Sequence, residues 1–385
     1  MKLRHFSLLT MLMLTAGAAQ AEVDPTNRAL SLAADLAAGA LKDQLQNCAS
    51  GPFTPTEFSI AHRGAPLGYP EHSREGYIAA AKMGAGIIEC DVTFTKDLEL
   101  VCRHSQCDLA SSTNILQTEL ANTCRQPFTP AQQGEPASAQ CCTSDITLAE
   151  FKTLCARPDV KNSQATSVDE FLAPLDSPVI DQPNQCGIVM SHRDSIELIR
   201  DLGAAFTPEL KRPEVPMPFN GFSQQDYAKK LLTEYQQAGV PTNQVYPQSF
   251  NIDDVRYWIE NHPQYAQQTI WLVPRQRQIV PLSLAELQSL KAEGVHIIAP
   301  PIPMLVQQNS NGQVEPTAFA KAAKASGLKI ITWTFESARA TKAVYGDTPG
   351  LMLETLEVLA QEIGVSGVFS DWPGTVTYYA NCSMN

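Results

Sequence analysis

Eight short apolar segments recur along the chain, and stretches with the periodicity of amphipathic helices separate most of them. The apolar segments span residues 58–64, 86–95, 205–211, 245–250, 269–275, 295–302, 328–335 and 367–372. The helical patterns span residues 73–83, 191–202, 223–238, 283–292, 316–325 and 351–363. This alternation favours parallel strands joined by helical crossovers, and eight such units predict an α/β fold of the closed TIM (β/α)8 barrel type.

An open, doubly wound sheet is the alternative fold for such a pattern. Doubly wound sheets that bind nucleotides carry a glycine-rich phosphate loop directly after a strand. Neither G-x-G-x-x-G nor G-x-x-x-x-G-K follows any of the eight apolar segments. The barrel is therefore the predicted fold.

One interval, about residues 105–183, interrupts the alternation after the second strand. It is rich in Thr, Gln, Ser, Pro and Cys, and its one helical pattern lies at residues 147–154. Six of the ten cysteines crowd into residues 107–186. We predict a disulfide-rich insertion over the mouth of a barrel domain that spans residues 58–385.

The first 21 residues have the pattern of a secretory signal peptide. A positively charged start precedes an apolar run over residues 6–14, and Ala19-Gln20-Ala21 forms an A-x-A cleavage site. The apolar run is too short to span a bilayer. We expect an exported protein, periplasmic or secreted, without stable insertion in a membrane. Residues 22–57 should form an N-terminal helical segment, with one amphipathic helix over residues 24–46.

Charge and cysteine content limit the possible partners. Without the signal peptide, 26 basic residues face 40 acidic ones, a formal charge of −14. This charge disfavours nucleic acid as a partner, but it permits an anionic small molecule at a locally basic site. In an exported chain an even number of cysteines indicates disulfides rather than a catalytic thiol, and Cys48 could pair with Cys382, although pairing cannot be deduced from sequence.

The second apolar segment ends in two carboxylates that alternate with a cysteine. Glu89 and Asp91 are two residues apart, so on a strand both point to one face and Cys90 points to the other. Two carboxylates brought together repel each other unless a proton or cation separates them, which favours a divalent metal site. Surface carboxylates are the alternative, but His62 and His104 end neighbouring apolar segments and suit an acid–base pair.

A third acidic residue lies at the end of the third barrel strand. Glu209 and Lys211 alternate onto one face of residues 205–211. With the two earlier carboxylates, Glu209 completes an all-oxygen ligand set, which Ca²⁺ and Mg²⁺ prefer. Lys211 and Arg63 would place positive charge beside the metal, a combination suited to a phosphate group. An ordinary Glu–Lys surface pair is the alternative.

The order of these motifs resembles that of one known family. They are Ala61-His62-Arg63-Gly64, Pro70-Glu71-His72-Ser73, Glu89-Cys90-Asp91-Val92, Thr95-Lys96-Asp97, Val101-Cys102-Arg103-His104, Pro208-Glu209-Leu210-Lys211, Gln248-Ser249-Phe250, Thr332-Trp333-Thr334 and Gly367-Val368-Phe369-Ser370-Asp371-Trp372-Pro373. Over about residues 58–373 the chain is similar to the glycerophosphodiester phosphodiesterase family. That family is a TIM barrel with an insertion after the second strand.

The resemblance implies a role for each matching residue. The general acid and base would be His62 and His104. The ligands of one divalent cation would be Glu89, Asp91 and Glu209. The groups that bind the phosphate would be Arg63 and Lys211. Glu71 would line the site and orient its neighbours. Trp333 would form an apolar wall for the glycerol moiety, with a core tryptophan as the alternative.

The implied reaction is the metal-dependent hydrolysis of a small-molecule glycerophosphodiester to sn-glycerol 3-phosphate and an alcohol. The neighbouring glycerol hydroxyl would attack first and form a cyclic phosphate, which water then opens. Such a reaction demands charge neutralisation on the phosphate and in-line placement of the entering and leaving groups. Export favours Ca²⁺ over Mg²⁺, because Ca²⁺ is the more available ion outside the cytoplasm.

The chain departs from the family pattern at two positions. It has His72-Ser73 where the family usually has Asn-Thr, and His104-Ser105 where the family usually has His-Asp. The support of His104 is therefore open. Two other functions also remain open: a phospholipase D-like enzyme acting on sphingomyelin or lysophospholipid, and a barrel that retains its metal but only binds its ligand.

Overall fold

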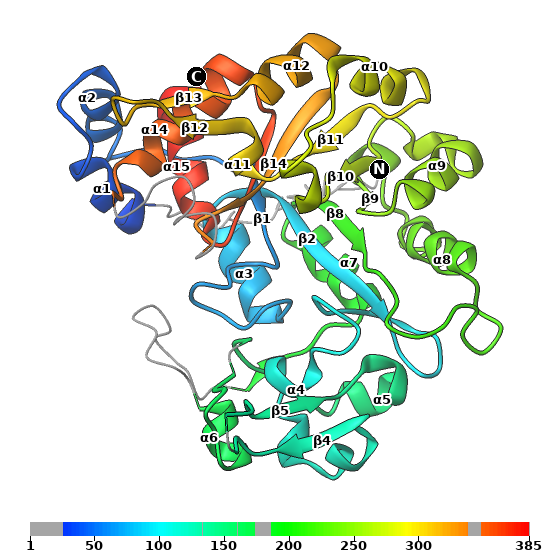
Figure 1. Ribbon diagram of the computed structural model, residues 1–385. Coiled ribbons are helices and arrows are strands. Elements are labelled where there is room, and N and C mark those ends of the chain that lie inside the picture. Colours follow the sequence, from blue (N-terminus) through cyan, green and yellow to red (C-terminus); the bar gives the residue numbers. More distant parts are fainter. Residues whose placement is uncertain (1–25, 133, 160, 174–185, 338–347, 385) are drawn as a thin grey trace, which may run out of the picture.

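The computed structural model describes residues 26–132, 134–159, 161–173, 186–337 and 348–384. The predicted signal peptide lies outside these residues. The chain forms a large barrel and a smaller lobe, which lies below the barrel in Figure 1. None of the helices in the described ranges is both long and apolar enough to cross a membrane.

Eight parallel strands form the barrel, and all eight had been predicted from the apolar segments. They are β1 (Thr56–Ala61), β2 (Ala85–Phe94), β8 (Ala205–Leu210), β9 (Gln248–Ser249), β10 (Ile270–Leu272), β11 (Ile297–Ala299), β14 (Lys329–Phe335) and β15 (Gly367–Ser370). Each pairs with the next in this order, and β15 pairs with β1, which closes the barrel. The predicted TIM barrel is confirmed.

Side chains alternate between the barrel interior and the surrounding helices. On β2, Ile87 belongs to the cluster inside the barrel, whereas Ile88, Cys90 and Val92 belong to the layer between strands and helices. Residues at odd positions of β2 therefore point inward. Because the odd positions continue to the carboxyl end of the strand, the acidic residues there point into the barrel mouth.

Helices surround the barrel, as Figure 1 shows. They are α3 (Arg74–Lys82), α7 (His192–Asp201), α8 (Gln224–Gln237), α9 (Ile252–Asn261), α10 (Leu284–Ala292), α11 (Ile302–Leu305), α12 (Ala318–Ser326), α14 (Leu351–Glu357) and α15 (Pro373–Ser383). A serine directly precedes each of the helices α7, α8 and α10, and its hydroxyl accepts a backbone N–H in a capping box. A short antiparallel pair, β12 (Val306–Gln308) and β13 (Val314–Pro316), follows α11.

The N-terminal segment differs from the single helix expected over residues 24–46. It forms two helices, α1 (Thr26–Ala34) and α2 (Ala40–Asn47), which the non-helical residues 35–39 separate. Gly39, in extended conformation, directly precedes α2. Cys48, directly after α2, forms a disulfide with Cys382 in α15, so the suggested pairing is correct. The two helices cover one end of the barrel through α15.

The described residues between 105 and 188 form the insertion lobe, which follows β3 (Leu100–Cys102), an antiparallel partner of β2. Its described elements are α4 (Leu109–Ser112), β4 (Gln126–Thr129), β5 (Ser138–Gln140), α5 (Leu148–Phe151), β6 (Cys155–Ala156), α6 (Val168–Leu172) and β7 (Gly187–Ile188). Its disulfides are Cys107–Cys142, Cys124–Cys141 and Cys155–Cys186. The helix expected at residues 147–154 is a single turn.

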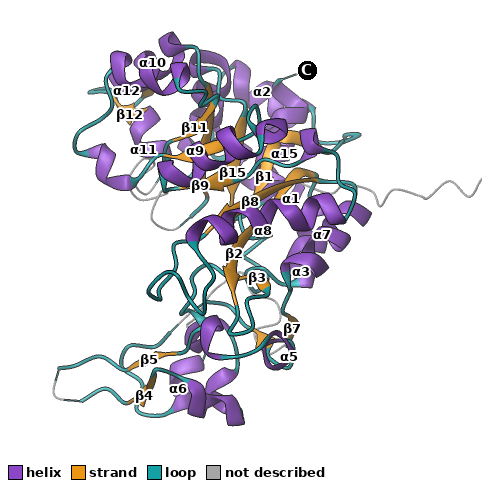
Figure 2. Ribbon diagram, turned by 90° about the vertical axis from the view of Figure 1, so that its right-hand side faces the viewer, coloured by secondary structure: helices purple, strands orange, loops and turns teal. Residues whose placement is uncertain are grey.

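The insertion lobe has its own core and lies to one side of the barrel mouth (Figure 2). Its buried side chains include Ile115, Phe151 and Phe171. It contacts the loop after β8, where Gln106 Oε1 accepts the backbone N–H of Glu214 at 2.6 Å. The lobe therefore borders the mouth on the side of β2 and β8.

Candidate active site

Three carboxylates meet at the carboxyl ends of two neighbouring strands. Asp91 on β2 lies opposite Glu209 on β8 in the parallel register, and Glu89 precedes Asp91 on the same face. One oxygen of each lies within 4.8 Å of the others, and all three side chains are buried. Oδ1 of Asp91 accepts no hydrogen bond from any described residue. A set of buried carboxylate oxygens fits a hard divalent cation.

Burial drives the pKa values of these carboxyl groups apart. Burial, with the charges of Asp91 and Glu209, raises the pKa of Glu89 well above its usual range. Burial also raises the pKa of Glu209 to about 8, against the opposing effect of Lys211. Burial acts in the same direction on Asp91, but Lys211 and His72 hold the pKa of Asp91 well below its usual range. A bound cation would favour the ionised form of all three.

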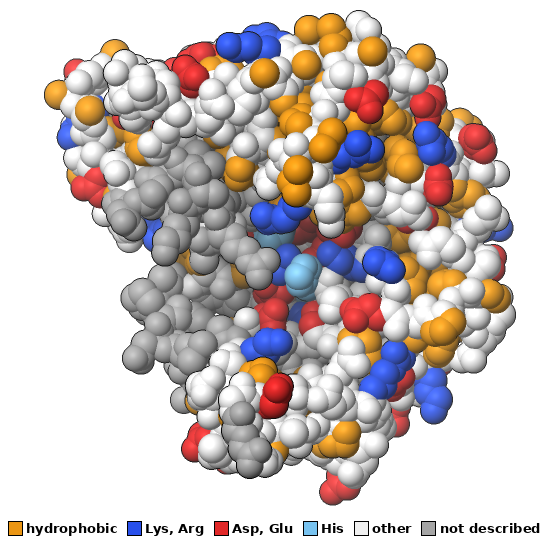
Figure 3. Space-filling view, viewed as in Figure 1, with side chains coloured by type: hydrophobic (Ala, Val, Ile, Leu, Met, Phe, Trp, Pro, Cys, Tyr) orange, Lys and Arg blue, Asp and Glu red, His pale blue; other side chains and the backbone are white. Residues whose placement is uncertain are grey.

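Two basic side chains border the carboxylates. Arg63 Nε lies 3.3 Å from Asp91 Oδ2, and Arg63 Nη1 donates to Glu71 Oε1 at 2.8 Å. Lys211 Nζ lies 2.8 Å from Glu209 Oε1 and 3.6 Å from Asp91 Oδ1. Figure 3 shows basic, acidic and histidine side chains gathered in the hollow between the barrel and the insertion lobe. A phosphate group there would meet two fixed positive charges.

The turn that carries Arg63 requires a glycine. Arg63 has a φ of 55° and Gly64 a φ of 95°. A Cβ on Gly64 would come within 2.9 Å of the Gly76 carbonyl carbon at the start of α3. The turn directs the backbone N–H of Arg63 to Glu89 Oε2 at 3.0 Å. The His-Arg-Gly motif thus fixes both the arginine and a carboxylate.

His62 follows β1 and lies between two carboxylates. Its Nδ1 is 2.5 Å from Oδ1 of Asp371, and its Nε2 is 3.9 Å from Oε2 of Glu89. With Nδ1–H donating to Asp371, Nε2 faces the carboxylate cluster. From the sequence, Asp371 was recognised only as part of the motif at residues 367–373, and no role was predicted for it. Its position directly after β15 was the signal that could have assigned it to the site.

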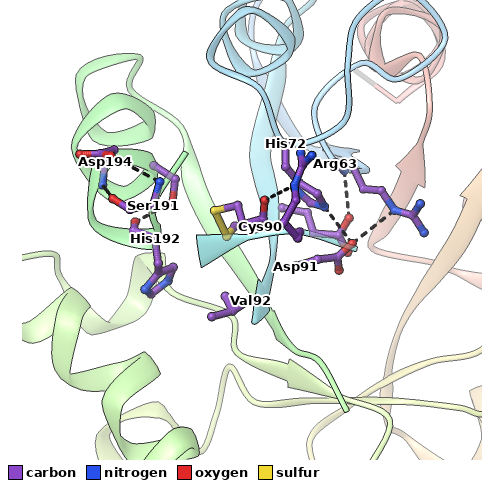
Figure 4. The surroundings of a disulfide bond; sticks show 12 residues. Arg63, His72, Cys90, Asp91, Val92, Ser191, His192 and Asp194 are labelled. Atoms are coloured by element: carbon purple, nitrogen blue, oxygen red, sulfur yellow. Dashed lines mark hydrogen bonds and ion pairs between the residues drawn. A yellow bond between two sulfur atoms is a disulfide. The ribbon is translucent and has the colours of Figure 1, made fainter. Parts of the chain in front are cut away.

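The buried His72 supports Asp91. His72 Nε2 is 2.9 Å from Asp91 Oδ2, and its Nδ1 is 3.0 Å from the Tyr77 hydroxyl. Burial lowers the pKa of His72 to about 4, so the imidazole is neutral, its Nε2–H donates to Asp91, and its Nδ1 accepts from Tyr77. In Figure 4, His72 and Arg63 converge on Asp91 while Cys90 points to the other side of the strand.

The disulfide that Cys90 forms joins β2 to β3. Its partner is Cys102, two residues before His104. The expectation that Cys90 points away from Glu89 and Asp91 is correct. The bond holds the segment that carries Asp91 beside the segment that leads to His104. The side-chain amide of Gln248 also contacts the carboxylate cluster, because its Nε2 donates to Glu89 Oε1 at 2.9 Å.

His104 lies at the edge of the insertion lobe. It lines a cavity of about 480 Å³ together with Ser105, Lys211 and Glu214. Burial, followed by the charges of Arg63 and Lys211, lowers the pKa of His104 well below its usual range. His104 therefore lies beside the basic side chains of the site, next to Lys211.

Trp333 lies farther round the rim, at the end of β14. Its indole N–H donates to the Ala299 carbonyl at 2.7 Å, and its ring meets the ring of Phe250 edge to face at 5.5 Å. The Arg275 guanidinium lies 4.8 Å above the Trp333 ring. Phe250 lines a cavity of about 540 Å³ that also reaches Glu209. The indole is half-buried rather than part of the closed core.

Comparison with known proteins identifies the family. A model of the glycerophosphoryl diester phosphodiesterase family matches residues 62–375. The chain belongs to this family. A curated relative from Arabidopsis thaliana, glycerophosphodiester phosphodiesterase GDPD6, is 26% identical over 86% of this chain and 92% of its own. A protein from Arthroderma benhamiae named "Extracellular protein" is 35% identical over 57% of this chain and 97% of its own.

Solved structures share the fold. A protein from Silicibacter pomeroyi named as a glycerophosphoryl diester phosphodiesterase superposes with a TM-score of 0.58 at 17% identity, over 85% of this chain and 93% of its own. A phosphodiesterase from Oleispira antarctica, in complex with its product sn-glycerol 3-phosphate, has a TM-score of 0.50 at 17% identity, over 85% of this chain and 96% of its own.

Membership of the phosphodiesterase family confirms the predicted resemblance and the prediction of an enzyme, a glycerophosphodiester phosphodiesterase. The five disulfides and the relative named as extracellular are consistent with export. The roles of the individual site residues stay predictions.

Proposed function

We propose that the chain hydrolyses glycerophosphodiesters to sn-glycerol 3-phosphate and an alcohol, with one divalent cation and two histidines. One observation carries the proposal: three buried carboxylates, Glu89, Asp91 and Glu209, converge within 4.8 Å beside two cationic side chains. The Oleispira antarctica structure, which holds sn-glycerol 3-phosphate, supports the identity of the product.

The carboxylates would hold the cation, and the cation would supply Lewis acidity to a non-bridging phosphate oxygen. Arg63 and Lys211 would neutralise the remaining charge that develops on the phosphate. Glu71 would keep the Arg63 guanidinium in place through their 2.8 Å hydrogen bond. These contacts bind and orient the diester without a covalent bond to the protein.

His62 and His104 would divide the proton transfers between them. The glycerol hydroxyl next to the phosphate loses its proton to one histidine while its oxygen bonds to phosphorus. The bond from phosphorus to the alcohol oxygen then breaks, and the departing alcohol takes a proton from the other histidine. The resulting cyclic phosphate is opened by water, which gives its proton to one histidine while the released ring oxygen regains a proton from the other. Trp333 would provide the apolar wall beside the glycerol carbons.

Export and cation choice belong to the same proposal. Residues 1–21 would be removed as a signal peptide, and the mature protein would reach the periplasm or the medium, with a barrel domain over residues 58–385. In that setting Ca²⁺ would be the resident ion in preference to Mg²⁺.

A coupled assay for released sn-glycerol 3-phosphate tests the proposal. Purified protein is stripped with a chelator and assayed on glycerophosphocholine before and after addition of Ca²⁺ or Mg²⁺. We expect activity only with metal, and at least a ~10²-fold lower turnover in His62→Ala and Glu89→Ala. Full activity of the stripped protein, or of His62→Ala, would refute the proposed mechanism.

A further inference from the structure

The insertion lobe brings a carboxylate to the second histidine. One donor atom each from Glu71, His104 and Asp159 lies within 4.8 Å of the others. Glu71 precedes α3 and His104 follows β3, whereas Asp159 belongs to the insertion lobe. The three residues therefore join the two parts of the molecule at the active site.

His104 has no hydrogen-bond partner on its own segment. The next residue is Ser105, where the family pattern usually has an aspartate. The nearest acid along the chain, Asp108, accepts the backbone N–H of Ser105 with its Oδ2 at 3.1 Å and forms no hydrogen bond with the His104 ring. Within the described ranges, no side chain hydrogen-bonds the His104 ring. A histidine that exchanges protons requires an acceptor on its second nitrogen to fix its tautomer and orientation.

Asp159 is better suited to this role than Glu71. The Glu71 carboxylate is held by Arg63 Nη1 at 2.8 Å. Asp159 is exposed and forms no ion pair with any residue in the described ranges. Apo active sites often have long catalytic hydrogen bonds that shorten when the substrate binds, so a separation within 4.8 Å suffices.

The segment that precedes Asp159 is firmly held. The backbone N–H of Arg157 donates to the Ser112 carbonyl at 2.8 Å, and Arg157 Nη2 donates to the Leu172 carbonyl at 2.7 Å. Cys155, two residues earlier, is in a disulfide with Cys186. Asp159 is thus carried to His104 by an anchored strand end rather than by a free loop.

We propose that the Asp159 carboxylate accepts a hydrogen bond from the His104 imidazole in the substrate complex, and so acts as a positioning residue for that histidine. The proposal rests on the proposed diester hydrolysis. The insertion lobe thereby completes the catalytic apparatus, because the acceptor that the position after His104 no longer provides is supplied from about fifty residues later in the chain.

A second cation bound by these three residues is the competing explanation. Glu71 already bonds a guanidinium, and Lys211 lines the same cavity as His104. A cation between Glu71 and His104 would meet both fixed positive charges. Charge therefore favours a hydrogen bond over a metal at this position.

Steady-state kinetics on glycerophosphocholine with Ca²⁺ test the role of Asp159. We expect Asp159→Asn to lower kcat about 10-fold to 100-fold with little change in KM, as for other groups that orient a catalytic histidine. Asp159→Glu should recover most of kcat, because it retains the negatively charged carboxylate that asparagine lacks. Asp169→Asn, which changes another exposed carboxylate of the insertion lobe, should behave as the wild type. The melting temperature should be the same in all four proteins.

Three results would overturn this role. A kcat of Asp159→Asn within about 2-fold of the wild type would show that His104 does not depend on Asp159. Loss of kcat together with a lower melting temperature and no rescue by Asp159→Glu would indicate a structural role. Loss of a second bound Ca²⁺ in a metal titration of Asp159→Asn would indicate a cation site. A wild type that releases no sn-glycerol 3-phosphate would refute the proposed function itself, and this proposal with it.

Discussion

Oδ1 of Asp371 lies 2.5 Å from Nδ1 of His62, although 309 positions separate the two residues in the sequence. They meet because the last barrel strand pairs with the first, with Ser370 opposite Ala61. Closure of the barrel therefore assembles the histidine with its acceptor. The bond holds the proton on Nδ1 and leaves Nε2 free to exchange a proton with substrate.

Asp371→Asn should reduce turnover while leaving the protein folded. The amide can donate to Nδ1, which would move the proton of the neutral imidazole to Nε2 and remove the acceptor that substrate needs. We expect kcat to fall about 10²-fold or more, measured by release of sn-glycerol 3-phosphate. Asp253→Asn, an exposed carboxylate on α9, is the matched control. Equal kcat for Asp371→Asn and Asp253→Asn would show that the contact between Asp371 and His62 does not contribute to catalysis.

His72→Asn, which restores the residue that the family usually has, should weaken metal binding. The imidazole reaches Asp91 Oδ2 at 2.9 Å, and an asparagine on the same backbone is too short to make that bond. A ligand that loses its hydrogen-bond donor binds metal about 10-fold to 100-fold more weakly. Calorimetric titration of chelator-treated protein with Ca²⁺ measures the change.

Tyr77→Phe is the control for this change. It removes the 3.0 Å contact to His72 Nδ1 but leaves the bond between His72 and Asp91. Its loss of Ca²⁺ affinity should therefore be smaller than that of His72→Asn. A wild-type Ca²⁺ affinity of His72→Asn would contradict the prediction. It would mean that the backbone at position 72, which has a φ of 52°, moves until the asparagine reaches Asp91.

The sequence predicted those parts of the site that depend on local geometry. Glu89 and Asp91 share a face because side chains on a strand alternate, and this holds wherever the strand lies. The bond from His72 to Asp91 could not be predicted in this way, because His72 lies in a loop whose path depends on tertiary contacts. Asp371 and Asp159 reach the histidines only through barrel closure and the folding of the insertion lobe.

The contrast between local geometry and tertiary contacts also explains which parts of the fold the sequence predicted. All eight strands were predicted because a buried parallel strand is a continuous apolar run bounded by polar residues. The break between α1 and α2 was missed, because the apolar pattern continues across Gly39. Helix α1 ends at Ala34, residues 35–39 are not helical, and α2 begins only after the extended backbone of Gly39.

Two disulfides should have different effects on stability and activity. Cys48–Cys382 closes 334 positions and Cys90–Cys102 closes 12. In the chain-entropy treatment their removal costs about 6 and about 3 kcal/mol of unfolding free energy, respectively. We expect Cys48→Ala/Cys382→Ala to lose more stability in urea but keep its kcat.

Cys90→Ala/Cys102→Ala should lose less stability but more activity. The bond links β2, which carries Asp91, to β3, which leads to His104. Without the disulfide, the distance between the carboxylate cluster and His104 should vary more. A displacement of about 1 Å can lower the rate about 10²-fold. Equal kcat in the two double variants would show that other contacts fix His104.

Glu336 should make the stability of the protein depend on pH. It is buried, with Arg28 Nε at 2.9 Å and the Thr375 hydroxyl donating to it at 2.9 Å. Burial nevertheless raises the pKa of Glu336 to about 7, from an ordinary value of 4.5. The folded protein thus binds this proton more tightly than the unfolded chain. The contribution to stability is complete below about pH 4.5 and is lost as the pH rises to about 7.

Glu336→Gln should therefore flatten the pH dependence of unfolding. The difference in unfolding free energy between pH 5 and pH 8, measured in urea, should shrink by up to about 3 kcal/mol, because glutamine cannot ionise. Glu197→Gln, which changes an exposed carboxylate on α7, should retain the wild-type slope. If Glu336→Gln kept the same slope, the carboxylate would be ionised throughout this range, and the contacts to Arg28 and Thr375 would outweigh its burial.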